Sequence, residues 1–209
     1  ILPDSAAGLP KSASRDLRLG DAELGQELGS ESSEVAEYGS GSGARSFTVS
    51  GWRFKDALSA YSFQQAQQGR STSMIRRANY VLDFAAAASL KPDQRDAFLT
   101  SLKNPVDGPV PELIALMPKK EAVAGSERYI TGPIALQRFL PRVPPGMLGF
   151  HYSAEAQMAR YVDGSTLVIV EYPLPSMARE RVEEFRKLPG ATVKRTGSRA
   201  VIVFDAPNE

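Results

Sequence analysis

The chain of 209 residues contains no cysteine and only one histidine, His151. The absence of cysteine excludes disulfides, thiolate metal ligands, iron–sulfur clusters and cysteine nucleophiles, and it is compatible with an oxidising compartment. One imidazole excludes a metal site built from several histidines. Any Ser–His–Asp triad would need His151, and no Gly-x-Ser-x-Gly motif accompanies it. We therefore expect no cofactor.

Charge of either sign is not in excess, and long apolar runs are missing. Lys plus Arg number 25 and Asp plus Glu 24, which gives a net charge of +1. Proteins dedicated to nucleic acid usually carry a basic excess, so we expect no nucleic-acid partner. No apolar run approaches the roughly 18–20 residues that cross a bilayer, so no transmembrane segment is expected. The chain begins at Ile1. We interpret it as a mature exported chain without its signal peptide; the alternative is a start point chosen for expression.

Composition divides the chain into four segments. Residues 1–16 are rich in proline, serine, alanine and glycine and predict an extended N-terminal arm. Residues 17–103 predict a first α+β repeat, and residues 128–209 predict a second. Residues 104–127 contain four prolines and predict a connector with at most one short helix, from Glu112 to Met117. We expect the two repeats to form one globular unit.

Capping and turn residues define the elements of the first repeat. Asp21 is expected to cap a short helix. The Gly/Ser run 39–43 is expected to join two strands; a phosphate-binding loop would need a helix after this run, whereas a strand follows it. Asp56 is expected to cap a helix that ends near Gln68, and Pro92 is expected to open the next helix.

The second repeat has similar signals. Pro133 suits the first position of a helix, where its missing N–H has no cost. Residues 147–153, "MLGFHYS", are expected to form a strand. Asp163 and Gly164 predict a tight hairpin turn, and Ser176 is expected to cap an amphipathic helix.

Several apolar positions recur at a fixed offset of 120 residues. The pairs are Trp52 with Tyr172, Val81 with Val201 and Phe84 with Phe204. Tyr38 and Tyr161 differ by 123, which is consistent with a longer first hairpin turn. These correspondences favour an internal duplication. The alternative is that two unrelated α+β halves share a common plan.

The predicted fold class is α+β. Each half is expected to run helix–strand–strand–helix–strand–strand, and the hairpins imply antiparallel pairing. Two similar halves of this kind would form antiparallel sheet with helices packed on one side. One continuous curved sheet is favoured because joining the halves hides two strand edges; two sheets packed face to face are the alternative.

Five stretches carry a family resemblance: "LGDAELGQEL", "VSGWRFKDALSAYSFQ", "RRANYVLDF", "GSERYITGP" and "LVIVEYPLPSMARERVEEF". As an ordered set, these stretches resemble a family of exported bacterial proteins known as domain of unknown function 6599. The chain departs from the pattern at "GQELGSESSEV", where the family carries aromatic residues. The resemblance implies an extracytoplasmic, periplasmic or secreted location. It implies no catalytic residue.

Three residues are candidates for ligand binding: Trp52, Tyr172 and His151. The two aromatics belong either to the core or to a solvent-facing binding platform. His151 is either a general acid/base or metal ligand, or a strand residue with a satisfied hydrogen bond. The favoured function is a non-enzymatic binding or interaction module with a protein or small-molecule partner. A structural role through an exposed sheet edge is a further alternative.

Paired carboxylates supply the enzymatic alternative. A carboxylate-based hydrolase needs neither cysteine nor histidine, and its acids would meet in the cleft between the two halves. The candidate acids are Asp83, Glu155, Asp163, Glu171 and Asp205. Acids are also common at turns and strand ends for solubility alone.

Overall fold

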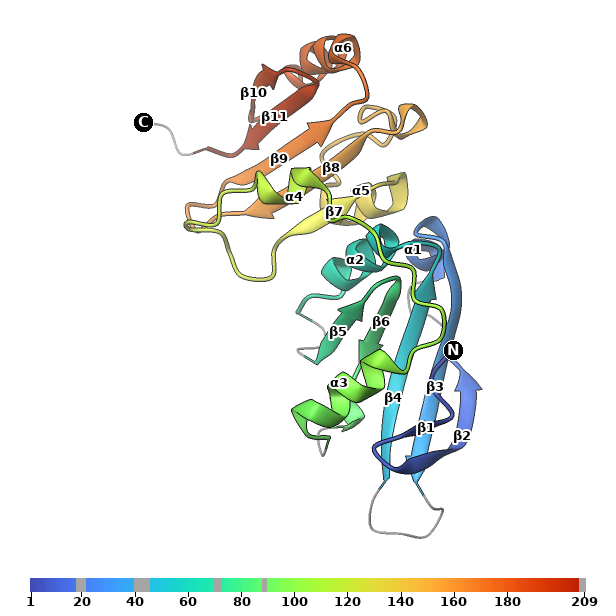
Figure 1. Cartoon of the computed structure of the whole chain (residues 1–209). Coiled ribbons are helices and arrows are strands. Elements are labelled where there is room, and N and C mark those ends of the chain that lie inside the picture. The colour runs from blue at the N-terminus through green and yellow to red at the C-terminus, as the bar shows by residue number, and fades with distance from the viewer. Residues whose placement is uncertain (18–21, 40–45, 70–72, 88–89, 207–209) are drawn as a thin grey trace. The chain divides into compact units, whose positions relative to one another are not determined.

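The computed structural model of the chain describes residues 1–17, 22–39, 46–69, 73–87 and 90–206. The chain divides into two compact units, Ile1–Pro109 and Val110–Glu209. Each unit contains its own antiparallel sheet, of six strands in the first and five in the second (Figure 1). The α+β class is therefore confirmed, whereas the single continuous sheet expected from edge protection is wrong. The boundary between the units falls within the proline-rich segment 104–127.

The first unit is built on a sheet with the strand order β1-β2-β3-β4-β6-β5. Its strands are β1 (Ser5–Ala6), β2 (Leu9–Asp16), β3 (Ser30–Gly39), β4 (Ser46–Phe54), β5 (Met74–Arg77) and β6 (Tyr80–Asp83). Its helices are α1 (Ala22–Glu27), α2 (Ala57–Ala66), the 3₁₀ helix η1 (Ala85–Ala87) and α3 (Pro92–Thr100). Asp56 caps α2 as predicted, since its carboxylate accepts a hydrogen bond from Ser59 N at 2.7 Å. The expected cap Asp21 and most of the Gly/Ser run 39–43 lie outside the described residues.

The residues expected as an N-terminal arm are part of this sheet. Strands β1 and β2 pair with each other, and β2 pairs with β3. Leu2 is almost completely buried, with 1% of its surface exposed. It packs against Gly51, where a Cβ would lie 2.6 Å from Leu2 Cδ2. The glycine is therefore required for this close approach.

Alternation along β4 supplies core residues to both faces of the first sheet. On one face, Trp52 and Phe54 pack against Phe63 of α2, with ring centroids 5.4 and 5.0 Å apart. On the other face, Phe47 of β4 stacks on Tyr38 of β3 with ring centroids 5.0 Å apart, and Phe98 of α3 makes an edge contact with Tyr38 at 5.6 Å. Helices therefore contribute to both cores, with α2 on one side and α3 on the other.

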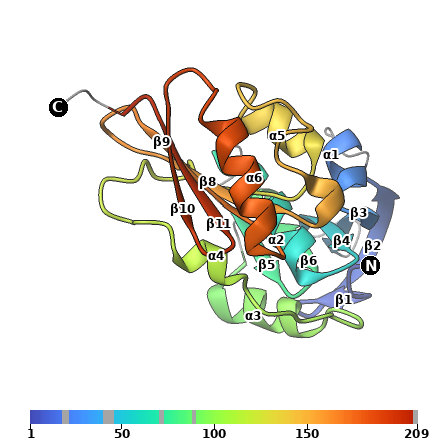
Figure 2. The same cartoon turned by 90° about the horizontal axis from the view of Figure 1, so that it is seen from above.

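The second unit has the strand order β10-β11-β9-β8-β7. Its strands are β7 (Arg128–Ile130), β8 (Glu155–Arg160), β9 (Thr166–Glu171), β10 (Ala191–Thr196) and β11 (Arg199–Phe204). Its helices are α4 (Glu112–Ala115), α5 (Pro133–Phe139), the 3₁₀ helix η2 (Phe150–Tyr152) and α6 (Pro175–Phe185). Figure 2 shows α5 and α6 on one side of this sheet and α4 on the other.

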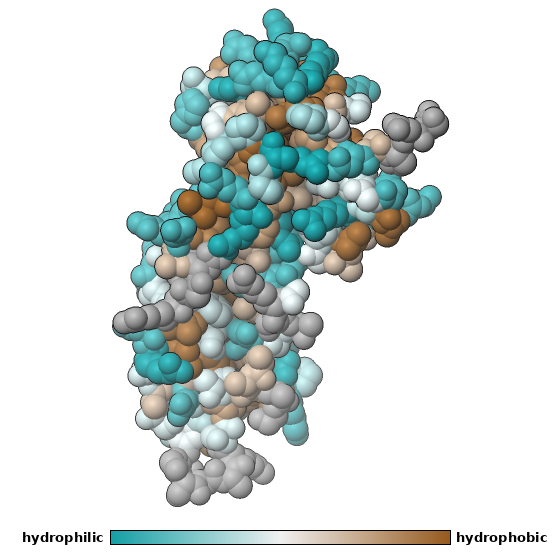
Figure 3. Space-filling view, turned by 180° about the vertical axis from the view of Figure 1, so that it is seen from behind, coloured by the Kyte–Doolittle hydropathy of each residue, from teal (hydrophilic) through white to brown (hydrophobic). Residues whose placement is uncertain are grey.

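Helix α6 buries Ala178, Val182 and Phe185, which share one face at helical spacing. The surface at the α6 end of the second unit is mostly hydrophilic (Figure 3). The expected cap Ser176 is wrong, because α6 begins one residue earlier, at Pro175. Leu174 is the N-cap residue and provides no side-chain bond. Proline is preorganised for the first helical position, and its missing N–H needs no cap.

The two units share one strand order. β2-β3-β4-β6-β5 corresponds to β7-β8-β9-β11-β10, with a helix after the first and third strands in chain order of each set. This agreement supports the predicted repeat of one structural plan. Tyr38 and Tyr161 occupy equivalent places in the two sheets. Tyr38 lies opposite Phe47, and Tyr161 N donates a hydrogen bond to Ser165 O. Ser165 is 118 positions after Phe47, which is the offset between β4 and β9.

The pairing of Trp52 with Tyr172 is wrong by two residues. Phe54 N donates to Asn79 O, and Tyr172 N makes the equivalent bond to Ser198 O. Both residues precede the helix N-cap by two positions, so the counterpart of Tyr172 is Phe54, 118 positions earlier. The pairs Val81/Val201 and Phe84/Phe204 are also wrong, each by one residue. Val81 lies opposite Trp52, and Ala200 lies opposite Val170, which is 118 positions after Trp52. The counterpart of Val81 is therefore Ala200.

Candidate functional site

The two aromatic candidates are core residues. Trp52 is 8% exposed and Tyr172 is 2% exposed. Among the described residues, neither the Trp52 indole nitrogen nor the Tyr172 hydroxyl has a hydrogen-bond partner. Burial, as the main cause, raises the pKa of Tyr172 above its ordinary range. The two residues lie in separate units and do not form a solvent-facing platform.

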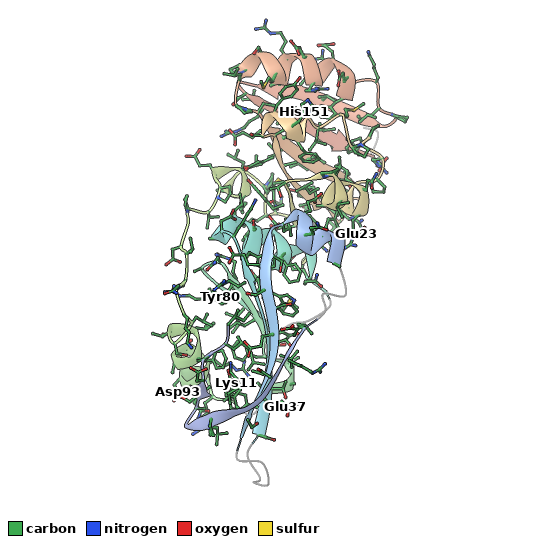
Figure 4. All side chains as sticks on the ribbon, turned by 90° about the vertical axis from the view of Figure 1, so that its right-hand side faces the viewer. Lys11, Glu23, Glu37, Tyr80, Asp93 and His151 are labelled. Atoms are coloured by element: carbon green, nitrogen blue, oxygen red, sulfur yellow. The ribbon has the colours of Figure 1, made fainter. Side chains whose placement is uncertain are left out.

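His151 lies in η2 and is exposed (Figure 4). The expected strand is wrong, because Gly149 and Ser153 at the ends of this turn both adopt left-handed backbone conformations. The imidazole contacts the Tyr152 ring, with centroids 3.8 Å apart. It makes no hydrogen bond or ion pair with another described residue, so the satisfied strand histidine is also wrong.

Three of the five candidate acids have local structural partners. Asp83 accepts hydrogen bonds from Ser73 Oγ at 2.6 Å and from a main-chain N–H two residues later. Asp163 accepts from Ser165 N at 2.9 Å in the predicted hairpin turn, and hydrogen bonds from Ser165 lower its pKa. Asp205 forms an ion pair with Arg142 at 2.6 Å. These contacts explain the three acids as turn and surface residues.

The other two acids are brought together by strand register. Glu155 of β8 lies directly opposite Glu171 of β9, so both side chains leave the same face of the sheet. The Tyr129 hydroxyl donates to Glu155 Oε2. Arg199 Nη2 lies 3.0 Å from Glu171 Oε1. We call Tyr129, Glu155, Glu171 and Arg199 the carboxylate row.

A second polar site lies at the end of β7 and β8, on the opposite face of the same sheet. A hollow of about 240 Å³ is present there. Its lining residues are Val123, Ala124, Gly125, Ser126, Arg128, Phe139, Met158 and Arg160. Arg128 is opposite Met158, and Arg160 follows Met158 by two residues, so both arginines leave the same face. We call this site the two-arginine hollow.

Arg128 is held through its guanidinium group, whereas Arg160 is held through its main chain. Arg128 Nη1 donates to Gly125 O at 2.8 Å and to Glu127 O at 2.6 Å. Its guanidinium carbon lies 5.0 Å from the ring centroid of Phe139, a cation–π distance. The Arg160 main chain is held by Ser126, whose Oγ accepts from Arg160 N at 3.0 Å and lies 3.3 Å from Arg160 O.

No described residue that lines the hollow is acidic. Burial, and then the positive charge of Arg160, lower the pKa of Arg128. Arg160 is exposed, and its guanidinium forms no ion pair with another described residue. An anion in the hollow would be stabilised by the positive charges of these two arginines.

The sequence reasoning did not identify this site. Arg128 and Arg160 are 32 positions apart, and each alone resembles an ordinary surface arginine. The sequence contains one indication of the site. Each arginine lies at the end of a strand, and the residue two positions away on the same face is apolar: Ile130 for Arg128 and Met158 for Arg160.

Comparison with protein-family models, with curated proteins and with solved structures gives no match. The family resemblance therefore stays a prediction. No group of three or more histidine, cysteine, aspartate or glutamate residues that could hold a metal ion occurs in the described part of the chain. No helix among the described residues is long and apolar enough to cross a bilayer.

Proposed function

We propose that the protein is an exported, non-enzymatic binding module that takes a small anionic ligand in the two-arginine hollow. The observation that carries the proposal is the convergence of Arg128 and Arg160 on one hollow. Arginine is favoured for anion recognition because its planar guanidinium presents several N–H donors in a fixed fork. The proposed extracytoplasmic location rests on the family resemblance and on the absence of cysteine.

The lining favours binding over catalysis. Apart from the two arginines, no residue that lines the hollow carries an acid, an imidazole or an amine. The hydroxyl of Ser126 is bonded to the main chain of Arg160, and no general base adjoins it in the hollow. A serine nucleophile needs such a base within hydrogen-bond reach.

The direct test is anion binding by calorimetry at constant ionic strength, with acetate and inorganic phosphate as probes. We expect Arg160→Gln to weaken binding at least tenfold, because it removes the arginine that has no ion-pair partner among the described residues. Arg195→Gln is the matched control, since Arg195 is exposed on β10 and the change in net charge is the same. Equal affinity in both variants would refute the proposal.

A carboxylate-based hydrolase is the second candidate, and the cross-strand pair of Glu155 and Glu171 favours it. Pairs of carboxylates perform glycoside hydrolysis when one acts as acid and the other as base or nucleophile. The ion pair between Glu171 and Arg199 also suits a purely structural role. A screen of glycoside and ester substrates decides between them. Turnover that Glu155→Gln abolishes, in a variant with unchanged folding, supports the enzyme; the absence of turnover removes this candidate.

A further inference from the structure

We infer that the outer edge of β10 is a docking site for an extended acidic segment of another protein, which joins the second sheet as an additional strand. This inference goes beyond the proposed function and does not depend on the two-arginine hollow. It rests on the register of β10, on the open main-chain groups of its outer edge and on its charge.

β10 is the terminal strand of the second sheet (Figure 1). It pairs with β11, and directly before β10 begins, Asp205 N donates to Gly190 O at 3.2 Å. Because hydrogen-bonded pairs alternate with non-bonded pairs along an antiparallel ladder, counting in steps of two from Gly190 gives the residues that bond β11. The residues between them, which include Val193 and Arg195, direct their N–H and C=O groups away from β11.

These outward-facing groups of β10 are open. Among the described residues, none bonds the main-chain N–H or C=O of Val193 or Arg195. A row of unpaired main-chain groups is a template to which an extended segment adds through main-chain hydrogen bonds. β10 therefore offers the alternating donors and acceptors that a docked strand needs.

β5 is the counterpart of β10 in the first unit, and the two strands have the same register at their turns. Arg76 Nη1 donates to Ala78 O at 3.4 Å, and Arg195 Nη1 donates to Gly197 O at 2.9 Å. Ala78 and Gly197 both follow the end of the strand by one residue, with φ of 53° and 59°. Arg195 therefore corresponds to Arg76.

The edge of β5 is closed at a position where the edge of β10 is open. Met74 lies two residues before Arg76, as Val193 lies two residues before Arg195. Met74 O accepts a hydrogen bond from Gln64 Nε2 of α2 at 3.3 Å. In the described part of the second unit, no side chain makes the corresponding bond to Val193 O. The second unit thus leaves available an edge that a helix side chain covers in the first.

The charge of the β10–β11 hairpin favours an acidic partner. Residues 186–204 contain five basic residues and no acidic one. On β10, Lys194 and Arg195 are exposed, and neither forms an ion pair with another described residue. Opposite charges on neighbouring strands stabilise a sheet, and like charges directly opposite each other destabilise it. These cations therefore disfavour pairing with β10 of a second copy and favour aspartate or glutamate in the docked strand.

The probe is the capped peptide Val-Thr-Val-Glu-Glu-Val-Thr-Val, whose sequence is the same in both directions and therefore suits parallel or antiparallel docking. Lys194 and Arg195 leave opposite faces of the sheet, and two consecutive glutamates place one carboxylate on each face. One control peptide has two lysines in place of the glutamates. A second control keeps the glutamates but has both of their amides N-methylated, which blocks a main-chain bond in either register.

Dissociation constants for the full chain are measured by calorimetry at constant ionic strength. We expect the acidic peptide to bind about tenfold more tightly than either control peptide, because each control loses the charge pairs or a main-chain bond. Lys194→Glu should weaken acidic-peptide binding about fivefold relative to Lys120→Glu. Lys120→Glu is the matched control because Lys120 lies outside β10 and its side chain is 90% exposed. Arg160→Gln should leave the affinity for the peptide unchanged, and circular dichroism checks the folding of each variant.

Several results would overturn the inference. Equal binding of the acidic and N-methylated peptides would show that charge alone attracts the peptide. Equal binding by Lys194→Glu and Lys120→Glu, or no binding at all, would remove β10 as the site, and a loss of binding in Arg160→Gln would assign the peptide to the two-arginine hollow. Tighter binding of an oligothymidylate of equal charge would point to nucleic acid instead. A dimer in sedimentation that Val193→Pro dissolves would assign the edge to a second copy of the chain.

Discussion

Glu34 of β3 is the best-connected carboxylate of the first unit, and its replacement by glutamine gives a quantitative test. Its Oε2 accepts hydrogen bonds from the Ile1 ammonium group at 2.7 Å and from Leu2 N at 2.9 Å, and its Oε1 accepts from Lys11 Nζ at 2.8 Å. The side chain is 12% exposed. Burial by itself raises the pKa of Glu34, but the hydrogen bonds from Leu2, Lys11 and the ammonium group outweigh it. Together they lower the pKa from 4.5 to about 2.

The lowered pKa sets the size and the pH range of the effect. One pKa unit corresponds to about 1.4 kcal/mol, so the ionised form contributes about 3 kcal/mol to the free energy of unfolding at neutral pH. Residual solvent screening reduces this, and we expect Glu34→Gln to cost about 2 kcal/mol at pH 7. Because the folded-state pKa is the lower one, the contribution is present above about pH 4.5 and is lost as the pH falls toward 2.

Urea denaturation at pH 7 and at pH 2.5 measures this contribution. Both proteins must begin at Ile1, since the ammonium group is one of the three donors. Glu37→Gln is the matched control because Glu37 is exposed on the same strand; Figure 4 labels Glu37 and Lys11. We expect the variants at 34 and 37 to differ by about 2 kcal/mol at pH 7 and by much less at pH 2.5. A difference that is the same at both pH values, or no difference at pH 7, would refute the reasoning.

Three further changes test individual contacts by urea denaturation. Asp56→Ala removes the cap that accepts from Ser59 N, and we expect a loss of about 1 kcal/mol; an unchanged midpoint would contradict the role of the cap. Asn79→Ala removes a buried amide that donates to Phe54 O at 2.6 Å, and we expect a loss of about 2 kcal/mol, with a loss below about 0.5 kcal/mol as the contrary result. Gln157→Leu should stabilise the second unit by about 1 kcal/mol, because Gln157 is fully buried and neither amide atom has a partner among the described residues; destabilisation would show that the amide is satisfied.

Local features were predicted well where one residue type has one strong conformational preference. Asp56 caps α2 through its carboxylate, and Asp163 makes the predicted turn with Gly164 at φ 88°. The prediction failed at residues 147–153, where a short apolar run fits a strand and a turn equally well. The left-handed backbone conformation of Ser153 ends the 3₁₀ helix η2 and is incompatible with a strand there. A single sequence does not reveal this conformation.

The candidate site was predicted only in part. The sequence named Glu155 and Glu171 among five acids, but only the register of β8 and β9 places them opposite each other. It did not name Arg128 or Arg160, because neither residue belongs to a motif. Strand alternation indicates which face a side chain takes, but not which residue of another strand lies beside it.

The sequence by itself determined the α+β class, the hairpins, most helix starts and the exclusion of thiol and multi-histidine chemistry. These follow from residue types and from short-range periodicity, which depend on neighbours along the chain. The tertiary structure decided that there are two sheets, that Tyr172 corresponds to Phe54 rather than Trp52, and that two arginines share one hollow. Those outcomes depend on strand register and on pairing between distant segments. A shift of two residues along a strand leaves every side chain on the same face of the sheet. Hydrophobic periodicity alone therefore does not show whether Tyr172 corresponds to Trp52 or to Phe54.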